Sequence, residues 1–311
     1  MIRLRTVSAA AAAVVAMSGL VSPVATVALA SGAAEELCVD EDAREIAANA
    51  RMADGSRSGA LDHREVGAAE AAAIEQRTQQ ILGQRGRAPA QSVTVPTFVH
   101  VMASSSGEGT VTDKQIRDQI AALNRTFGGT ESPAAAKTGF TFELVGTKTY
   151  FEDRWHLDRQ SRGYRSVTRV GGPETLNIWL VDFVYLGMAT FPWDYEKDPA
   201  VDGVRVHYGS LPGGVLKYYD EGKTATHEVG HWLGLYHVFQ GGCTGEGDYV
   251  ADTPPQGTPS YECPLGKDSC EGDGPDSVTN YMDYSDDFCY DRFTADQSTR
   301  MGGHWTAYRA A

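Results

Sequence analysis

Three histidines, a glutamate and a glycine stand at fixed offsets in the sequence HEVGHWLGLYH, which begins at His227. His227 and His231 are four residues apart, so a helix would place both imidazoles on one face, one turn apart. Gly234 can take the positive φ that ends a helix, and the chain can then turn to bring His237 to the same point. Three imidazoles suit Zn²⁺ and leave its fourth position open for water. Glu228 would stand beside the ion, where it can take a proton from that water.

The competing interpretation of this motif is an amphipathic core helix with incidental histidines. HExxH alone is expected by chance in roughly one unrelated chain of this length in twenty to thirty. The added glycine and histidine lower that expectation to about one in ten thousand. The full motif therefore favours a catalytic metal site.

Length and charge narrow the classes of protein to which the chain can belong. It has 311 residues, enough for one or two domains, with 41% hydrophobic and 22% charged residues, which is ordinary for a globular protein. Its net charge of −14 argues against nucleic acid and against anionic membrane surfaces as partners. We expect a monomer with neither of these partners.

The first thirty residues are typical of a secretory signal peptide. Arg3 and Arg5 precede a run of apolar and small residues at 9–21, and Ala28-Leu29-Ala30 has the form of a cleavage site. The alternative is a transmembrane anchor, but the run is shorter than the roughly 20 apolar residues that a bilayer span needs. The pattern predicts a signal peptide at 1–30 and a secreted protein.

Residues 31–90 differ in composition from the rest of the chain, being rich in Ala, Glu, Arg and Gln. Helices are predicted at 42–52 and 64–82, followed by an exposed linker at 83–89. The segment is either a charged extension or a propeptide that is cleaved at Arg85 or Arg87. We favour a propeptide, because an enzyme with an open zinc site would otherwise be active during export.

Five cysteines are present, and four of them fall late in the chain, at Cys243, Cys263, Cys270 and Cys289. In an exported chain these four predict two disulfides, and the sequence alone allows three pairings. The alternative is a second zinc site, against which stands the absence of any CxxC pair. Cys38 is left over, and its thiolate could occupy the open position of the zinc and hold a zymogen latent. A free thiol and an intermolecular disulfide are the other interpretations of Cys38.

The elements that must position the motif are predicted upstream of it. Strands are predicted at 92–102, 140–150, 176–183 and 203–208, and a helix at 112–127. Thr112 is suited to begin that helix. A short extended run at 186–193, bounded by glycine and proline, is typical of an edge strand. The order indicates a mixed sheet backed by helices, with the motif on a helix that begins near Asp220.

The chain after His237 is acidic and rich in loops, with a closing helix predicted at 293–308. Such a segment has little hydrophobic core of its own and needs covalent cross-links, which disulfides between the cysteines can supply. The acidic run also suggests Ca²⁺, a hard cation with oxygen ligands. Asp248, Asp252 and Thr253 are the candidate calcium ligands, and a solvated acidic surface is the alternative.

Taken together, the motifs resemble one family of peptidases. HEVGHWLGLYH matches the metzincin signature HExxHxxGxxH at every fixed position, and NYMDY at 280–284 is similar to the metzincin Met-turn. With GDYVADTP after Glu246 and four interleaved cysteines, the chain from Ser92 to Tyr308 resembles the pappalysin family. It is most similar to the small secreted, cytophagalysin-like members.

This resemblance implies an α+β fold with a metzincin-type catalytic domain at 91–311. The domain would comprise an N-terminal subdomain at 91–237, with a mixed, mostly parallel sheet and an active-site helix. A loop-rich, disulfide-stapled C-terminal subdomain would follow at 238–311. The resemblance also implies the pairings Cys243–Cys270 and Cys263–Cys289.

The resemblance further implies roles for particular residues. An extended substrate would add as a strand along the edge formed by Gly187, Met188, Ala189 and Thr190. Met282 would pack beneath the metal, and the phenol of Tyr284 would donate a hydrogen bond to the developing oxyanion. The simpler alternatives are an ordinary edge strand, a core methionine and a surface tyrosine.

The function that these observations predict is hydrolysis of peptide bonds by a secreted zinc endopeptidase. His227, His231 and His237 would hold Zn²⁺, and Glu228 would act as the general base on water. A non-catalytic zinc protein and a zinc hydrolase with another kind of substrate are the rivals. The intact glutamate argues against the first rival, and the edge strand and Met-turn argue against the second.

Overall fold

The computed structural model describes residues 51–53, 64, 66–85, 92–272 and 274–310, all within the unit Val39–Ala311. The predicted signal peptide, Cys38, Arg87 and nearly all of the helix predicted at 42–52 lie outside the described residues. Within the part of the chain that the structure describes, no helix is long and apolar enough to cross a membrane.

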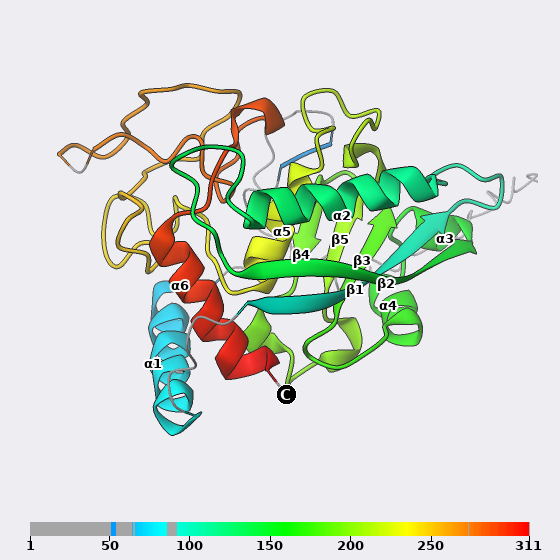
Figure 1. The fold of residues 1–311 in the computed structure, drawn as a ribbon, viewed down its shortest axis with the longest axis horizontal. Coiled ribbons are helices and arrows are strands. Elements are labelled where there is room, and N and C mark those ends of the chain that lie inside the picture. Colours follow the sequence, from blue (N-terminus) through cyan, green and yellow to red (C-terminus); the bar gives the residue numbers. More distant parts are fainter. Residues whose placement is uncertain (1–50, 54–63, 65, 86–91, 273, 311) are drawn as a thin grey trace, which may run out of the picture. The chain divides into compact units, whose positions relative to one another are not determined.

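A five-stranded sheet forms the centre of the fold, with the strand order β2-β1-β3-β5-β4 (Figure 1). The strands are β1 (Val93–Ala103), β2 (Phe140–Phe151), β3 (Leu176–Val181), β4 (Gly187–Ala189) and β5 (Val204–His207). All neighbouring strands are parallel except β4, which runs antiparallel to β5 at the edge. The prediction of a mixed, mostly parallel sheet is therefore confirmed.

The two faces of the sheet are covered by different helices, with α2 on one face and α4 on the other (Figure 1). Helices α2 (Asp113–Phe127) and α5 (Lys223–Trp232) share a hydrophobic core with one face of the sheet. Helices α3 (Asp153–His156) and α4 (Ser161–Thr168) contribute side chains to a smaller hydrophobic cluster, which contains Trp179 of β3. Every residue of β3 is buried, as expected of a central strand with both faces covered.

The helices α2 and α5 begin in different ways. Thr112 caps α2 in a capping box with Gln115, as its residue type predicts. Helix α5 begins at Lys223, later than the predicted start near Asp220. Gly222 has a φ of +83°, which keeps the residues before it out of the helix. The carboxylate of Asp287 holds this start from a distance, because it accepts hydrogen bonds from the backbone N–H groups of Glu221 and Lys223.

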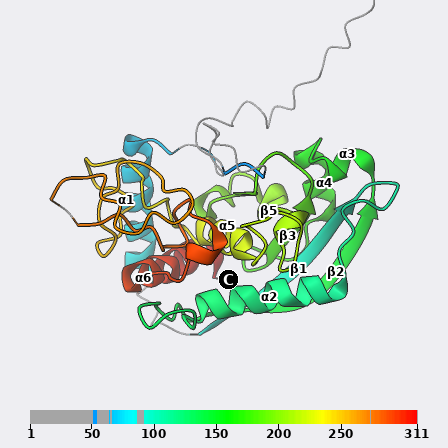
Figure 2. The ribbon, with the colours of Figure 1, turned by 90° about the horizontal axis from the view of Figure 1, so that it is seen from above.

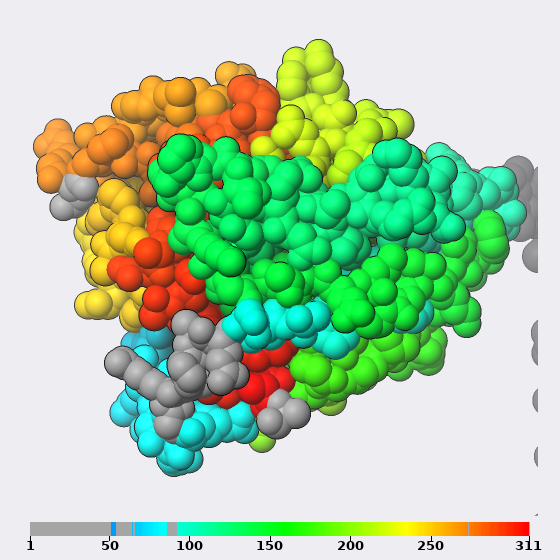
Figure 3. All heavy atoms as spheres, viewed as in Figure 1, coloured from blue at the N-terminus to red at the C-terminus, as the bar shows by residue number. Residues whose placement is uncertain are grey.

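Helix α1 (Ala68–Arg85) lies beside the closing helix α6 (Ala295–His304) at the surface, as Figure 3 shows. The prediction of a linker is wrong for residues 83–85, because α1 continues through Arg85. The guanidinium of Arg85 donates hydrogen bonds to the carbonyls of Thr306 and Ala310, which holds this end of the helix. Helix α6 ends at His304, earlier than predicted, and a π-helical turn follows it.

The remaining elements are single turns. They are the 3₁₀ turns η2 (Pro192–Asp194), η3 (Pro199–Val201), η4 (Tyr208–Ser210) and η5 (Asp287–Cys289), and the π turn η6 (Trp305–Arg309).

The C-terminal segment is built from loops, which gather at one end of the sheet while α3 and α4 lie at the other (Figure 2). It contains the disulfides Cys243–Cys270 and Cys263–Cys289, the pairing that the resemblance implies. Buried carboxylates also hold it: Asp283 accepts hydrogen bonds from the backbone of Ser260, the amide of Gln256 and the backbone of Tyr284. Burial raises the pKa of Asp283 to about 6.

Candidate active site and metal centre

The three histidines of the motif converge on one buried point. The Nε2 atoms of His227 and His231 are 3.1 Å apart, those of His231 and His237 are 3.1 Å apart, and those of His227 and His237 are 3.2 Å apart. All three side chains are buried. The predicted set of three imidazoles is therefore assembled with its Nε2 atoms close enough to share one ion.

Backbone carbonyls orient two of these rings. Nδ1 of His227 donates to the carbonyl of Tyr281 at 2.6 Å, and Nδ1 of His231 donates to the carbonyl of Leu235 at 2.8 Å. A carbonyl can only accept, so each ring carries its proton on Nδ1 and turns the lone pair of Nε2 toward the common point. Lone pairs this close repel one another unless a cation lies between them. The donor set therefore fits Zn²⁺, which binds neutral imidazole nitrogens.

The turn that returns His237 to the site depends on Gly234. Its φ is +98°, and a Cβ built on it would lie 2.5 Å from Cγ of His304. A larger residue would be strained in its backbone and would collide with the ring of His304. The helix ends at Trp232, so the sequence-based prediction of an abrupt stop near Gly234 agrees with the structure.

Glu228 is fully buried on α5, next to His227 in the sequence, and lies against the edge strand β4. A Cβ built on Gly187 would lie 2.3 Å from Oε1 of Glu228 and 2.5 Å from its Cδ. Only glycine leaves room here, so the carboxyl group of Glu228 lies directly against the backbone of β4. This contact joins the candidate base to the predicted substrate edge.

The predicted Met-turn packs against the same helix. Met282 is buried, and a Cβ on Gly230 would lie 2.4 Å from its Sδ. The ring centroid of Tyr284 is 4.8 Å from that of His237 and 5.8 Å from that of His227. Tyr284 is thus a buried neighbour of the histidines, and the alternative of a surface tyrosine is wrong.

Sequence reasoning missed a buried ion pair that holds the end of α5. Both Nη atoms of Arg309 lie 3.1 Å from the carboxylate oxygens of Asp202, and Nε of Arg309 donates to the carbonyl of Trp232. The indole of Trp232 also donates to Asp202. Asp202 and Arg309 lie more than a hundred positions apart in the chain, and no local pattern identifies them as partners.

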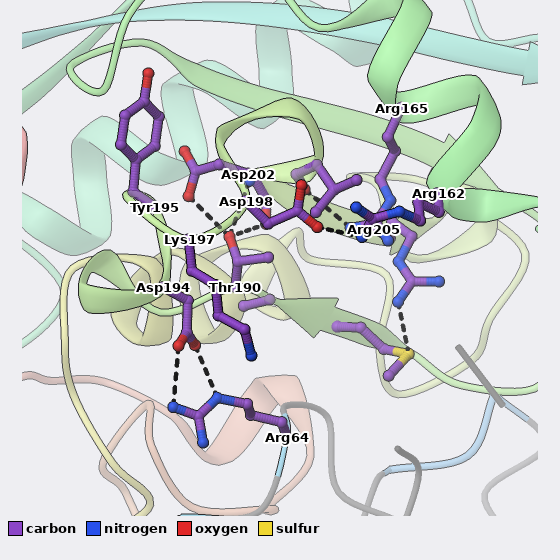
Figure 4. Close-up of a pocket in the computed structure, with 14 residues that line it drawn as sticks. Arg64, Arg162, Arg165, Thr190, Asp194, Tyr195, Lys197, Asp198, Asp202 and Arg205 are labelled. Atoms are coloured by element: carbon purple, nitrogen blue, oxygen red, sulfur yellow. Dashed lines mark hydrogen bonds and ion pairs between the residues drawn. The ribbon is translucent and has the colours of Figure 1, made fainter. Parts of the chain in front are cut away.

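A cavity of about 210 Å³ lies beside the edge strand, lined by Met188, Ala189 and Thr190 (Figure 4). Several cations line it as well, and they face acidic partners. Arg64 donates two hydrogen bonds to Asp194, at 2.9 and 3.0 Å. The cavity places a polar, charged surface next to the predicted substrate strand.

A piece of the predicted propeptide pairs with the chain immediately before β4. Met52 and Tyr185 form an antiparallel bridge, and the backbone N–H of Leu186 donates to the carbonyl of Arg51 at 2.9 Å. Arg51 is itself buried, and its guanidinium carbon lies 5.8 Å from the ring centroid of Tyr284. The segment at 51–53 therefore reaches the surroundings of the candidate site.

The candidate calcium ligands are only partly brought together. The carboxylate of Asp248 is buried and accepts from the hydroxyl of Thr253 at 2.8 and 2.9 Å. Burial raises the pKa of Asp248 to about 7. Asp252 is exposed, and its carboxylate accepts from the backbone N–H of Asp296 at the start of α6.

Comparison with known proteins places this geometry among peptidases. The model of the peptidase M43 family, described as pregnancy-associated plasma protein-A, matches residues 186–305. Extracellular metalloprotease 1 of Coccidioides posadasii is 43% identical over 225 residues, which are 70% of this chain and 79% of the relative. An extracellular metalloprotease of Colletotrichum graminicola is 42% identical over 233 residues, covering 72% of this chain and 80% of the relative.

Solved structures give the same result. A promirolysin variant of Tannerella forsythia aligns with a TM-score of 0.65 and 28% identity, over 76% of this chain and 88% of its own. Mature mirolysin of the same organism, in complex with a cleaved peptide, aligns with a TM-score of 0.59 and 29% identity, over 71% of this chain and 97% of its own.

Proposed function

The chain belongs to the peptidase M43, or pappalysin, family and is a metalloendopeptidase, and on that premise we propose that it is secreted, depends on zinc and uses Glu228 as its general base. The observation that carries the proposal is the convergence of three Nε2 atoms within 3.1–3.2 Å of one another, with Glu228 buried beside them.

His227, His231 and His237 are the residues that hold the metal in this proposal. Bound Zn²⁺ supplies a Lewis acid that polarises the scissile carbonyl and lowers the pKa of water to about 7. The carbonyls of Tyr281 and Leu235 keep two of the rings in the required tautomer. Their hydrogen bonds fix the direction of the ligand lone pairs before any metal arrives.

Glu228 takes the proton from the attacking water and passes it to the leaving amine. Its burial against β4 supports this role, because a substrate strand along β4 would carry the scissile bond past the carboxylate. Tyr284 donates a hydrogen bond from its phenol to the tetrahedral oxyanion, as its ring position beside His227 and His237 supports. Met282 positions the site from below by packing against Gly230.

Protein and peptide substrates bind by strand addition along β4. One side of this strand pairs with β5, and within the described ranges no strand pairs with Gly187–Ala189 on the other side. Met188, Ala189 and Thr190 are only partly buried and line the adjacent cavity. The main-chain groups of such an edge can pair with any extended peptide, which suits an endopeptidase.

Residues 31–90 act as the propeptide of a zymogen in this proposal, after removal of a signal peptide at 1–30. The pairing of residues 51–53 with the chain before β4 supports a segment that lies along the substrate edge. Cys38 is the candidate for the fourth zinc ligand in the latent form. Arg85 is a poor cleavage point, because it lies in α1 and is hydrogen-bonded to the closing turn, so Arg87 is the better candidate.

Ca²⁺ is the second proposed cofactor. Asp248 and Thr253 are its candidate ligands together with Asp252, which would have to leave its hydrogen bond with Asp296. The support is the buried carboxylate of Asp248, which a cation would stabilise in its charged form. A rise in the melting temperature of the zinc-loaded protein on adding Ca²⁺, lost in Asp248→Asn, is expected. An equal rise in that variant contradicts this site.

The main test uses Glu228→Ala with a casein digestion assay and a measurement of bound zinc. We expect zinc to stay at one equivalent while hydrolysis is lost, because the glutamate is not a ligand. His231→Ala should lose the zinc as well. Hydrolysis by Glu228→Ala at the rate of the unaltered enzyme would refute Glu228 as the base, and full zinc in the His231 variant would refute the ligand set.

Latency is tested with Cys38→Ala in the full-length precursor. The variant should cleave a quenched peptide or process itself, because the open position of the zinc is no longer occupied. Val39→Ala, at the next position in the chain, is the matched control, since it leaves the thiol of Cys38 in place. An equally latent Cys38→Ala precursor would mean that another group provides the latency.

A further inference from the structure

Three side chains with metal-binding atoms meet at the carboxyl end of the parallel strands, away from the three-histidine site. Glu108 follows β1, Asp182 follows β3, and His156 ends α3. Their ligand atoms all lie within 4.8 Å of one another. We propose that Glu108, His156 and Asp182 bind a divalent transition-metal ion, in a second site that braces the chain leading into β4.

The ring of His156 is the strongest evidence for a ligand. The side chain is only 3% exposed, and its Nδ1 donates to the carbonyl of Met102 at 2.9 Å. The other nitrogen, Nε2, therefore carries the lone pair of the neutral ring. It is buried and, among the described residues, has no hydrogen-bond partner, while Oδ2 of Asp182 faces it at 3.5 Å. A buried acceptor left without a donor is costly, and a metal ion between the two atoms removes that cost.

A second histidine holds the carboxylate of Asp182 in place. Nδ1 of His207 accepts from the backbone N–H of Gly209 at 3.0 Å, so its proton must lie on Nε2. That Nε2–H lies 3.2 Å from Oδ1 of Asp182. Burial lowers the pKa of His207, which favours the same neutral form. One oxygen of Asp182 is thus bound by His207, and the other is directed at His156, as in the outer shell of a metal site.

The loop that carries Glu108 is shaped to lie against His156. Gly107 and Gly109 both have positive φ, and a Cβ on Gly109 would lie 2.5 Å from Cε1 of His156. The backbone N–H of Ser104 donates to the carbonyl of Glu108, and the hydroxyl of Ser104 accepts from the N–H of Glu108. The loop is therefore held at its base, while the carboxylate of Glu108 stays exposed and leaves a path for an ion.

The mixture of donor atoms indicates which ion the site would take. One imidazole nitrogen with carboxylate oxygens suits Zn²⁺ or Mn²⁺, whereas Ca²⁺ takes six to eight oxygen ligands. The site would act on the substrate edge through the chain, because Asp182 begins the segment that runs to Gly187, the residue against Glu228. The competing arrangement is an ion pair between a protonated His156 and Asp182 with no metal.

The test uses the full-length, zinc-loaded protein and equilibrium dialysis against Mn²⁺, with millimolar Ca²⁺ present to fill any calcium site. We expect one saturable equivalent of Mn²⁺ beyond the zinc, and a rise in melting temperature as it binds. Glu108→Gln alters an exposed side chain and so preserves the fold, and it should weaken Mn²⁺ binding by at least about tenfold. His156→Asn should abolish the binding. Glu143→Gln, an exposed glutamate on β2, should bind as the unaltered protein does.

Two outcomes would overturn the proposal. Absence of saturable Mn²⁺ binding up to millimolar concentration would leave only the ion pair. Binding that Glu108→Gln and His156→Asn both leave unchanged would place the ion elsewhere. Circular dichroism of each variant separates loss of the site from loss of the fold, and Glu108→Gln decides the matter if His156→Asn does not fold.

Discussion

The two halves of the catalytic region are stabilised by different means. From 92 to 237, apolar side chains of the sheet, α2 and α5 pack into one continuous core, and β3 is buried on both faces. From 238 to 310, much of the stabilisation comes from two disulfides and from buried carboxylates that each accept several hydrogen bonds. The first half is held mainly by the hydrophobic effect. The second half adds side chains such as Tyr281, Phe293 and Met301 to the same core, and it is held in addition by cross-links and polar contacts.

In the proposed mechanism, the two halves also contribute different groups to the site. The first half supplies Glu228 and the candidate histidine ligands, and the second supplies the carbonyl of Tyr281 and the side chain of Met282, which orient them, together with the phenol of Tyr284. Replacing Glu228 should therefore alter chemistry more than stability. Removing a cross-link of the second half should alter stability first and chemistry through it.

The largest expected effect comes from Glu228→Ala. Loss of the proposed general base should lower kcat/KM by about 10²–10⁴-fold, equivalent to about 3–5 kcal/mol of transition-state stabilisation. Zinc content should not fall, since the three candidate ligands are imidazoles and Glu228 is not one of them. Glu246→Ala, at an exposed loop position, is the control and should leave kcat/KM unchanged.

Removal of Cys263–Cys289 by paired serine substitutions should lower the free energy of unfolding by about 3 kcal/mol. The pair Cys243–Cys270 spans 27 residues and Cys263–Cys289 spans 26, so the entropic contributions of the two bridges are nearly equal. Cys289 is buried two residues after Asp287, which holds the start of α5, whereas Cys243 is exposed. Urea unfolding and kcat/KM of the two double variants should therefore show the larger loss for Cys263–Cys289. Equal losses would contradict the coupling of this bridge to α5.

Gly187→Ala should have a smaller effect on activity, of about 10–100-fold in kcat/KM, which is about 1.4–2.7 kcal/mol. The added methyl group would overlap Oε1 of Glu228 and displace the carboxylate from its working position. Gly302→Ala is the matched control, because a Cβ there meets nothing within 4 Å. If both alanine variants retain the original kcat/KM, the close approach of β4 to the base is not needed.

The smallest effect concerns the pH dependence of stability and Asp283. Its pKa is raised by burial from 3.8 to about 6, so between these pH values the folded state binds the proton more tightly than the unfolded state. The free energy of unfolding should therefore fall as the pH rises from about 4 to about 6, and Asp283→Asn should remove part of that fall, on the order of 1 kcal/mol. Urea unfolding at several pH values measures it, with exposed Asp268→Asn as the control. An unchanged pH profile in Asp283→Asn would contradict the raised pKa.

Local sequence patterns predicted most of the sheet half. Each predicted strand there matches a strand of the structure to within a few residues, and Thr112 caps α2 as its residue type indicates. Helices α3 and α4 were not predicted, and the boundary errors arise where a distant residue decides where an element begins or ends. Asp287 holds the start of α5, and contacts with the closing turn extend α1 through Arg85.

The part of the candidate site that depends on local sequence patterns was also predictable. The spacing of the three histidines and Gly234 is a local property of one helix and one turn, and the structure brings the three rings together. The contact between Gly187 and Glu228, and the ion pair of Asp202 with Arg309, join residues far apart in the chain. Nothing in the spacing of such residues identifies their partner.

The sequence by itself determined which atoms could bind a metal and on which helix they lie, because helical periodicity and a glycine stop are encoded within eleven residues. Only the tertiary structure decided what surrounds them: the carbonyl that orients His227, the edge strand against Glu228, and the meeting of Glu108, His156 and Asp182. The physical reason is that such contacts depend on how the strands and loops pack in three dimensions, and that packing is a sum of many weak interactions along the whole chain.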